Sequence, residues 1–254
     1  MEKMLSTQEV GRYRGKFGEL PNIRHLENPA SAIDVVLGTP RYLKDKNISS
    51  ILHSYSEGFI SDLEIVDWFS SPQAGQLGGM HNFKISSISP ENKISVFYRA
   101  CTAVVVFGKS IETNERISFL THQSPAIFSY PSKGWFIDSL VSRLREFKKY
   151  AQKGTIDAVI AGGYFSQTVP IEHGCYAGSY LKALKTLGRI LTEELQFSPR
   201  VVLGPSRDGR LYIDIALETQ AGKMYIMPTE EIDHSDQSNQ VHFSFQWFEV
   251  DNLM

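Results

Sequence analysis

Cys101 and His122 are the two side chains whose types and spacing best fit nucleophilic catalysis. Cys101 lies at a break between two segments of strand-forming composition, and His122 ends the next such segment, 21 positions later. If these strands form a hairpin, the thiol and the imidazole meet at one end of a sheet. A free thiol is only slightly ionised at neutral pH, and a neighbouring imidazole both takes its proton and stabilises the thiolate. The spacing therefore predicts a nucleophile paired with a base.

A third polar group usually orients the histidine of such a pair. The candidates near the pair, each with a hydroxyl or an amide that can hydrogen-bond a ring nitrogen, are Ser95, Thr102, Thr121 and Gln123. The alternative interpretation gives the pair no chemistry. Cys101 is then a small buried apolar side chain, and His122 is a surface residue of the turn before Pro125.

A second cysteine and histidine stand close together in the sequence, at His173 and Cys175. They precede a segment of helical periodicity, and the dipole at a helix N-terminus lowers the pKa of a nearby thiol. Residues two positions apart need not face each other, however, and the distance from the helix start weakens the dipole effect. We therefore expect Cys175 to be an inert loop thiol, although only geometry can decide between the two cysteines.

Other polar features favour turns or solvent-exposed surface. Gly162-Gly163 lacks the spacing of a phosphate-binding loop, and the acidic segment 230–236 lacks the spacing of a calcium or zinc site. No serine lies in a nucleophile elbow. The cationic side of the segment 136–150 indicates a solvated helix face, with docking of an acidic protein as the alternative. We expect no metal site.

The elements that must position the pair follow from hydrophobic periodicity. Strands are predicted over 94–107 with a break at the cysteine, 116–120, 156–161, 200–203, 211–218, 224–227 and 241–250. Helices are predicted over 48–69 with an interruption near Gly58, over 136–150, and over 179–195 with Ser179 as N-cap. The first 47 residues indicate a loosely ordered start, and 70–79 a loop and candidate boundary. This order predicts an α+β layered fold rather than a doubly wound one.

Composition limits the class of protein. The 254 residues, 42% hydrophobic and 21% charged, suffice for one large or two small domains and rule out disorder as the main state. A net charge of −2 gives no general attraction to nucleic acid or membrane. Two cysteines are too few for a disulfide scaffold, no apolar stretch approaches the roughly 18–20 residues of a membrane span, and the start lacks the apolar core of a signal peptide. We expect a cytoplasmic protein, with secretion as an effector as the alternative, and an unspecified oligomeric state.

The order of these segments between residues 94 and 227 resembles the CheD family of chemoreceptor glutamine deamidases. The sequence TAVVVF after Cys101 is similar to that family's cysteine segment, and His122 to its histidine. Ser95, six positions before the cysteine, stands where the family tends to have a threonine. The segments IDAVIAGG, VVLGPSRDGRLYIDI and ALETQAGKMYI follow in the family's order.

The resemblance implies a fold and an activity. The fold is a sandwich of two packed sheets flanked by helices over 85–254, with 1–84 as a partly helical N-terminal extension. The activity is deamidation of a glutamine in a protein substrate without any cofactor, with Cys101 as nucleophile, His122 as base and Ser95 orienting the imidazole. Backbone N–H groups near Cys101 would hold the oxyanion.

The sequence also departs from the family. Arg99-Ala100 replaces the small Gly-Ser before the cysteine, and the tail after Pro228 has no counterpart. These differences favour a divergent member of the family. Other deamidases with a Cys-His pair, such as the cytotoxic necrotizing factor toxins, share the same layered core, so the resemblance also allows a toxin or effector role. Two alternatives remain open: a non-enzymatic protein-interaction module that keeps the fold, and a cysteine protease or acyl transferase that uses the same pair.

Overall fold

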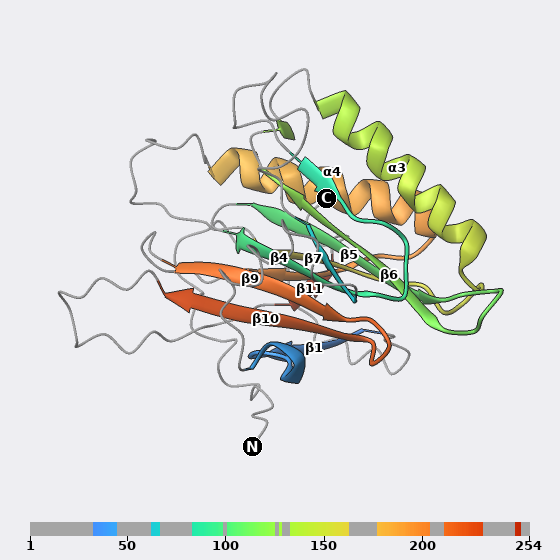
Figure 1. The fold of residues 1–254 in the computed structure, drawn as a ribbon. Coiled ribbons are helices and arrows are strands. Elements are labelled where there is room, and N and C mark those ends of the chain that lie inside the picture. The colour runs from blue at the N-terminus through green and yellow to red at the C-terminus, as the bar shows by residue number, and fades with distance from the viewer. Residues whose placement is uncertain are drawn as a thin grey trace.

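Two mixed β-sheets pack face to face, and two helices cover the outer face of one of them (Figure 1). The computed structural model describes residues 33–44, 62–66, 83–98, 101–124, 127–128, 133–162, 177–203, 211–230 and 247–249. The predicted α+β sandwich of two packed sheets with flanking helices is confirmed. No helix in these described ranges is both long and apolar enough to cross a membrane.

The five-stranded sheet has the order β1-β10-β9-β4-β2. Its strands are β1 (Asp34–Leu37), β2 (Leu63–Ile65), β4 (Asn92–Tyr98), β9 (Leu211–Glu218) and β10 (Lys223–Glu230). The two edge strands, β1 and β2, pair in parallel with their neighbours, whereas β4, β9 and β10 are antiparallel. A short 3-10 helix, η2 (Arg41–Leu43), follows β1, and its Leu43 packs into an apolar cluster on the outer face of this sheet.

The six-stranded sheet has the order β11-β8-β7-β5-β6-β3. Its strands are β3 (Phe83–Ile85), β5 (Thr102–Lys109), β6 (Arg116–Gln123), β7 (Asp157–Gly162), β8 (Arg200–Leu203) and β11 (Trp247–Glu249). The central strands β5 and β7 are buried along nearly their whole length, because one face meets the other sheet and the opposite face meets the helices.

The core between the sheets is built from alternate residues of both. Ala103, Val105 and Phe107 of β5 face Ile213 and Ile215 of β9 across this layer. Strand alternation then turns Val104 and Val106 to the opposite face, toward the helices. This alternation decides which polar side chains of β5 and β6 lie between the sheets.

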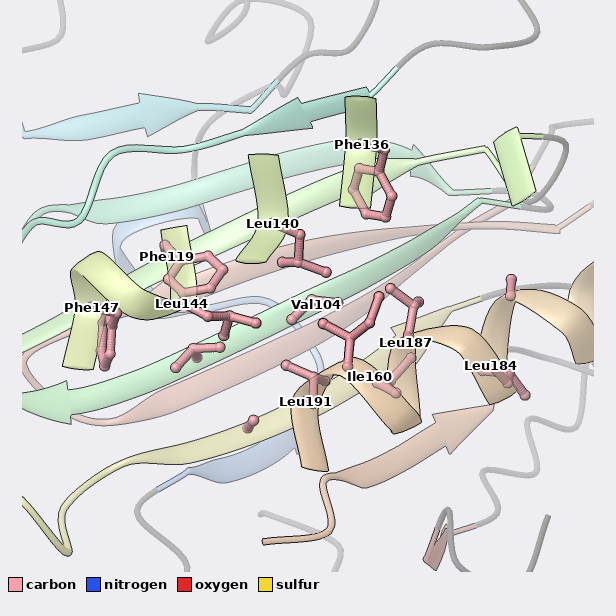
Figure 2. Packing of buried hydrophobic residues seen from close by; sticks show 14 of the residues in the cluster. Val104, Phe119, Phe136, Leu140, Leu144, Phe147, Ile160, Leu184, Leu187 and Leu191 are labelled. Atoms are coloured by element: carbon pink, nitrogen blue, oxygen red, sulfur yellow. The ribbon is translucent and has the colours of Figure 1, made fainter. Parts of the chain in front are cut away.

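The helices α3 (Lys133–Tyr150) and α4 (Ala177–Leu195) fill the second core (Figure 2). Their apolar stripes recur every three or four residues, as an amphipathic helix on a sheet requires. The labelled side chains that meet strand residues there are Phe136, Leu140, Leu144, Phe147, Leu184, Leu187 and Leu191. Both helices were predicted, with α3 beginning three residues earlier than its apolar periodicity.

Three local predictions are wrong. Leu63–Ile65 forms β2 and not part of a helix over 48–69, because Leu63 and Ile65 are buried two positions apart and the segment pairs with β4. Ser179 is not an N-cap, since α4 already begins at Ala177. The start of the chain is not loosely ordered throughout, because Asp34–Leu37 forms β1.

The strand β1 is held by partners far away in the sequence. The backbone N–H of Ile33 donates to Oδ2 of Asp157 at 3.1 Å, and the Arg200 guanidinium donates to the Ile33 carbonyl at 3.0 Å. Arg200 also pairs with Asp157 at 2.8 Å. The strands β1, β2 and β3 all include residues before position 85, and all three pair within the two sheets.

Candidate functional site

The hairpin of β5 and β6 brings Cys101 and His122 to the same end of the six-stranded sheet. Thr102 pairs with Gln123, so Cys101 directly precedes β5 and His122 is the penultimate residue of β6. The predicted strand break at the cysteine and the predicted hairpin are both confirmed. In this register Ala103 lies opposite His122, and Cys101 is its diagonal neighbour. Diagonal neighbours on adjacent strands lie roughly 7–8 Å apart.

Cys101 and His122 differ in exposure. Cys101 is half-buried and packs against the cluster between the sheets, whereas His122 is fully buried. The alternative that His122 is a surface residue of a turn is therefore wrong. Cys101 is thus the more exposed of the two residues.

Ser95 of β4 lies on the imidazole from the other sheet. Its Oγ is 3.0 Å from Nδ1 of His122, and the same Oγ donates to the Val66 carbonyl at 2.6 Å. A hydroxyl has one hydrogen, so Ser95 gives it to Val66 and accepts the hydrogen of Nδ1. His122 consequently has its hydrogen on Nδ1 and its lone pair on Nε2, as a base that takes a thiol proton at Nε2 requires.

Tyr98 stacks on the same imidazole. The two ring centroids are 3.9 Å apart and the planes are inclined by 15°, while the Tyr98 hydroxyl donates to the Thr121 carbonyl at 2.9 Å. Burial raises the pKa of Tyr98 well above its usual value, and the charges of Cys101 and Asp214 raise it further. Tyr98 is thus a neutral phenol stacked on the imidazole.

Burial keeps the imidazole neutral. It lowers the pKa of His122 to about 3, from an ordinary value of 6.5. At neutral pH the resting site therefore holds an uncharged ring and no imidazolium.

Gly162, the last residue of β7, permits the backbone of Cys101 to approach. Its φ is +82°, and a Cβ there would lie 2.9 Å from the Cys101 carbonyl oxygen. Any side chain would thus be strained and would also push against the residue that carries the thiol. The sequence indicated only turn geometry for Gly162-Gly163, because the approach depends on the pairing of Gly162 with Thr102 across two strands.

The other candidates for orienting the imidazole lie on the opposite face of the hairpin. Thr121 donates to Oε1 of Gln123 at 2.6 Å, and Nε2 of Gln123 donates to Thr102 at 3.0 Å. Thr121 also accepts the backbone N–H of Val104 at 2.7 Å. This buried network joins β5 to β6 beneath the site, whereas Ser95 is the candidate that the structure places on Nδ1 of His122.

A buried lysine near Ser95 was not foreseen from the sequence. Lys93 precedes Ser95 by two positions on the same face of β4, and its Nζ donates to Oγ of Ser89 at 2.9 Å and to the Glu91 carbonyl at 3.1 Å. Glu64 of β2 lies 3.9 Å from the same nitrogen. Burial lowers the pKa of Lys93 to about 8, and the charges of Glu64 and Glu91 oppose this shift.

Several sequence features lie outside the described residues, namely Arg99-Ala100, Pro125, His173, Cys175 and the segment 231–236. Within the ranges described, no group of three or more His, Cys, Asp or Glu side chains is placed to hold a metal ion.

No protein-family model matches this chain, and neither does any curated protein. The geometry of the site therefore carries the functional argument.

Proposed function

We propose that this protein is a cysteine-dependent amidohydrolase that converts a glutamine side chain of a protein substrate into glutamate, as the resemblance to the CheD family implies. The observation that carries the proposal is the buried hydrogen bond between Ser95 and Nδ1 of His122. It leaves the ring lone pair on Nε2, in a site where Tyr98 stacks on the imidazole and Cys101 lies at the same end of the sheet.

In the first half of the reaction, Sγ of Cys101 attacks the carboxamide carbon of the glutamine. The thiol proton moves to Nε2 of His122, so the sulfur is negatively charged only while the new C–S bond forms. Backbone N–H groups near Cys101 hold the oxyanion of the tetrahedral intermediate. The C–N bond then breaks, the leaving nitrogen takes the proton from Nε2 and departs as ammonia, and a thioester remains.

In the second half, water attacks the thioester carbon and gives a proton to Nε2. The C–S bond breaks, the sulfur recovers that proton, and glutamate is released. No group is oxidised or reduced, and water is the only co-reactant. Ser95 keeps Nδ1 as the protonated nitrogen throughout, so that Nε2 is always the position that exchanges protons.

The low pKa of His122 determines how the proton moves. Because burial disfavours the imidazolium, the ring of His122 is neutral at rest and the site holds no thiolate–imidazolium ion pair. Proton transfer then accompanies attack on the amide, when the charge that develops on the substrate oxygen and the sulfur offsets the charge on the ring. This is general-base catalysis, as opposed to activation of a preformed thiolate.

The reaction is tested with a library of glutamine-containing peptides, by measuring ammonia and locating converted residues by mass spectrometry. Cys101→Ser and His122→Ala should each abolish ammonia release, while Cys175→Ser should retain it. Retained release in either of the first two variants would overturn the assignment. Cleaved peptides without ammonia would instead identify a protease. We place the activity in the cytoplasm, where reducing conditions preserve the thiol.

A further inference from the structure

Tyr98 stacks on the proposed base, and the mechanism above gives it no role. Its ring lies almost parallel to the imidazole of His122, with 3.9 Å between the centroids. Tyr98 is 1% exposed and His122 is fully buried, so the contact is made without water on either ring.

The Tyr98 ring is fixed at both ends. Its backbone belongs to β4, where it pairs with Ile213 of β9 in the five-stranded sheet. Its hydroxyl crosses to the six-stranded sheet and donates to the carbonyl of Thr121, the residue directly before His122. The phenol thus spans the gap between the sheets. The imidazole packs against an aromatic ring whose orientation is fixed by both sheets.

This surface also matters for charge. The face of an aromatic ring attracts a cation that lies within about 6 Å of its centroid, and more strongly where water is excluded. Tyr98 remains a neutral phenol at neutral pH, so its ring adds no charge of its own. The imidazolium formed on His122 during attack would meet the electron-rich face of Tyr98 in a site that otherwise disfavours a positive charge.

We propose that Tyr98 is the positioning residue of this site: its ring holds the plane of the His122 imidazole toward Cys101 and stabilises the imidazolium that forms when the thiol proton is transferred. The inference rests on the proposed function, since it assumes that His122 is the base for Cys101. It adds that the aromatic ring, and not the phenolic hydroxyl, supplies the effect.

The test measures alkylation of Cys101 by chloroacetamide, a small electrophile with a carboxamide, at one neutral pH and with adduct formation at Cys101 followed by mass spectrometry. Wild-type protein should react faster than His122→Ala. Tyr98→Leu should lose about tenfold in rate and approach His122→Ala, as expected from the loss of a buried cation–aromatic contact. Tyr98→Phe, which keeps the ring and loses the bond to Thr121, should stay within about threefold of wild type.

Phe107→Leu is the matched control. Phe107 is as buried as Tyr98 and lies in the same layer between the sheets, but it is six positions from Cys101 on β5. Its truncation removes an aromatic ring from that core and should leave the alkylation rate unchanged. If Phe107→Leu slows alkylation as much as Tyr98→Leu does, the effect is general loosening of the core and the inference is wrong.

The remaining outcomes separate the two proposals. Equal rates in wild type and His122→Ala would mean that the imidazole does not assist the thiol, which contradicts the proposed function itself. A fast Tyr98→Leu, or a slow Tyr98→Phe, would contradict the role of the ring and leave the function standing. A measurement on wild type alone covers the case in which Tyr98→Leu does not fold. The ring protons of His122 should then be shifted upfield by the stacked ring, and ordinary shifts would overturn the inference.

Discussion

The hydroxyl of Ser95 meets the imidazole of His122 across the gap between the two sheets, with 3.0 Å between Oγ and Nδ1. Ser95 belongs to β4 of the five-stranded sheet and His122 to β6 of the six-stranded sheet. The proposed base and its proposed orienting group are therefore brought together only by sheet packing. Any change that separates the sheets also breaks this hydrogen bond, and the ring hydrogen of His122 is then no longer held on Nδ1.

Ser95→Ala should reduce activity more than its effect on folding explains. The variant leaves the Nδ1 hydrogen and the Val66 carbonyl without the Ser95 hydroxyl in a fully buried layer, at a cost of about 1–3 kcal/mol in the free energy of unfolding. It also lets the ring hydrogen move to Nε2, where it blocks proton transfer. Ser95→Thr keeps the hydroxyl and should restore most of the activity. Ammonia release and chemical denaturation together check this.

Ser118→Ala is the control for Ser95→Ala. Ser118 is also fully buried on β6, and its hydroxyl bonds that of Thr219, just beyond β9 of the other sheet, at 2.9 Å. Its loss should lower stability by about 1 kcal/mol with ammonia release per folded molecule unchanged. If both alanine variants lose activity in proportion to their stability, Ser95 has no specific role in the site.

Gly162→Ala should displace Cys101. The added Cβ would lie 2.9 Å from the Cys101 carbonyl oxygen, and this atom is backbone and cannot rotate away. The positive φ of 82° adds a strain of about 1–2 kcal/mol. Gly154→Ala is the control. Its φ of +83° gives the same backbone strain, but a Cβ there meets nothing within 4 Å. We expect both variants to be destabilised and only Gly162→Ala to lose ammonia release. Equal activities would show that the Cys101 backbone tolerates the contact.

The parts of the site that the sequence could predict are those encoded by neighbouring residues. The break at Cys101, the β5–β6 hairpin and the helices follow from strand composition, turn residues and apolar periodicity, all of which act within a few positions. Ser95 could be predicted because a hydroxyl near the pair is expected, and because its spacing from Cys101 resembles that of a known family.

The parts that escaped prediction depend on contacts between distant segments. The Ser95 hydroxyl donates to the carbonyl of Val66, which lies 29 positions earlier in the sequence. The apolar spacing around Val66 is also consistent with a helix. Ile33 and β1 are held by Asp157 and Arg200, 124 and 167 positions away. The need for glycine at position 162 arises only once β7 lies beside β5. None of these contacts leaves a local pattern in the sequence.

Acid should destabilise the fold through His122. Burial holds its pKa at about 3 in the folded state, compared with 6.5 when exposed, so the unfolded chain binds this proton more readily. The stability is complete above pH 6.5 and is lost as the pH falls toward 3. His122→Gln cannot titrate and should show a flatter decline in denaturation free energy over this range. The nearby titratable groups Tyr98, Cys101 and Lys93 are present in both proteins, so their contributions cancel in the comparison. Parallel pH curves would contradict this assignment.

Lys93 should act in the opposite range of pH. Burial lowers its folded-state pKa to about 8 from 10.5, so between these values the unfolded chain holds a proton that the folded protein releases. The free energy of unfolding should therefore rise through this window, by up to about 3 kcal/mol for a shift of this size. Other lysines and tyrosines also titrate there, and subtracting the curve of Lys93→Met isolates the contribution of Lys93. The difference should grow in favour of wild type from pH 8 to 10.5. A difference that stays constant would mean that Glu64, Glu91 and Ser89 hold the ammonium fully charged, with its hydrogen bonds compensating for burial.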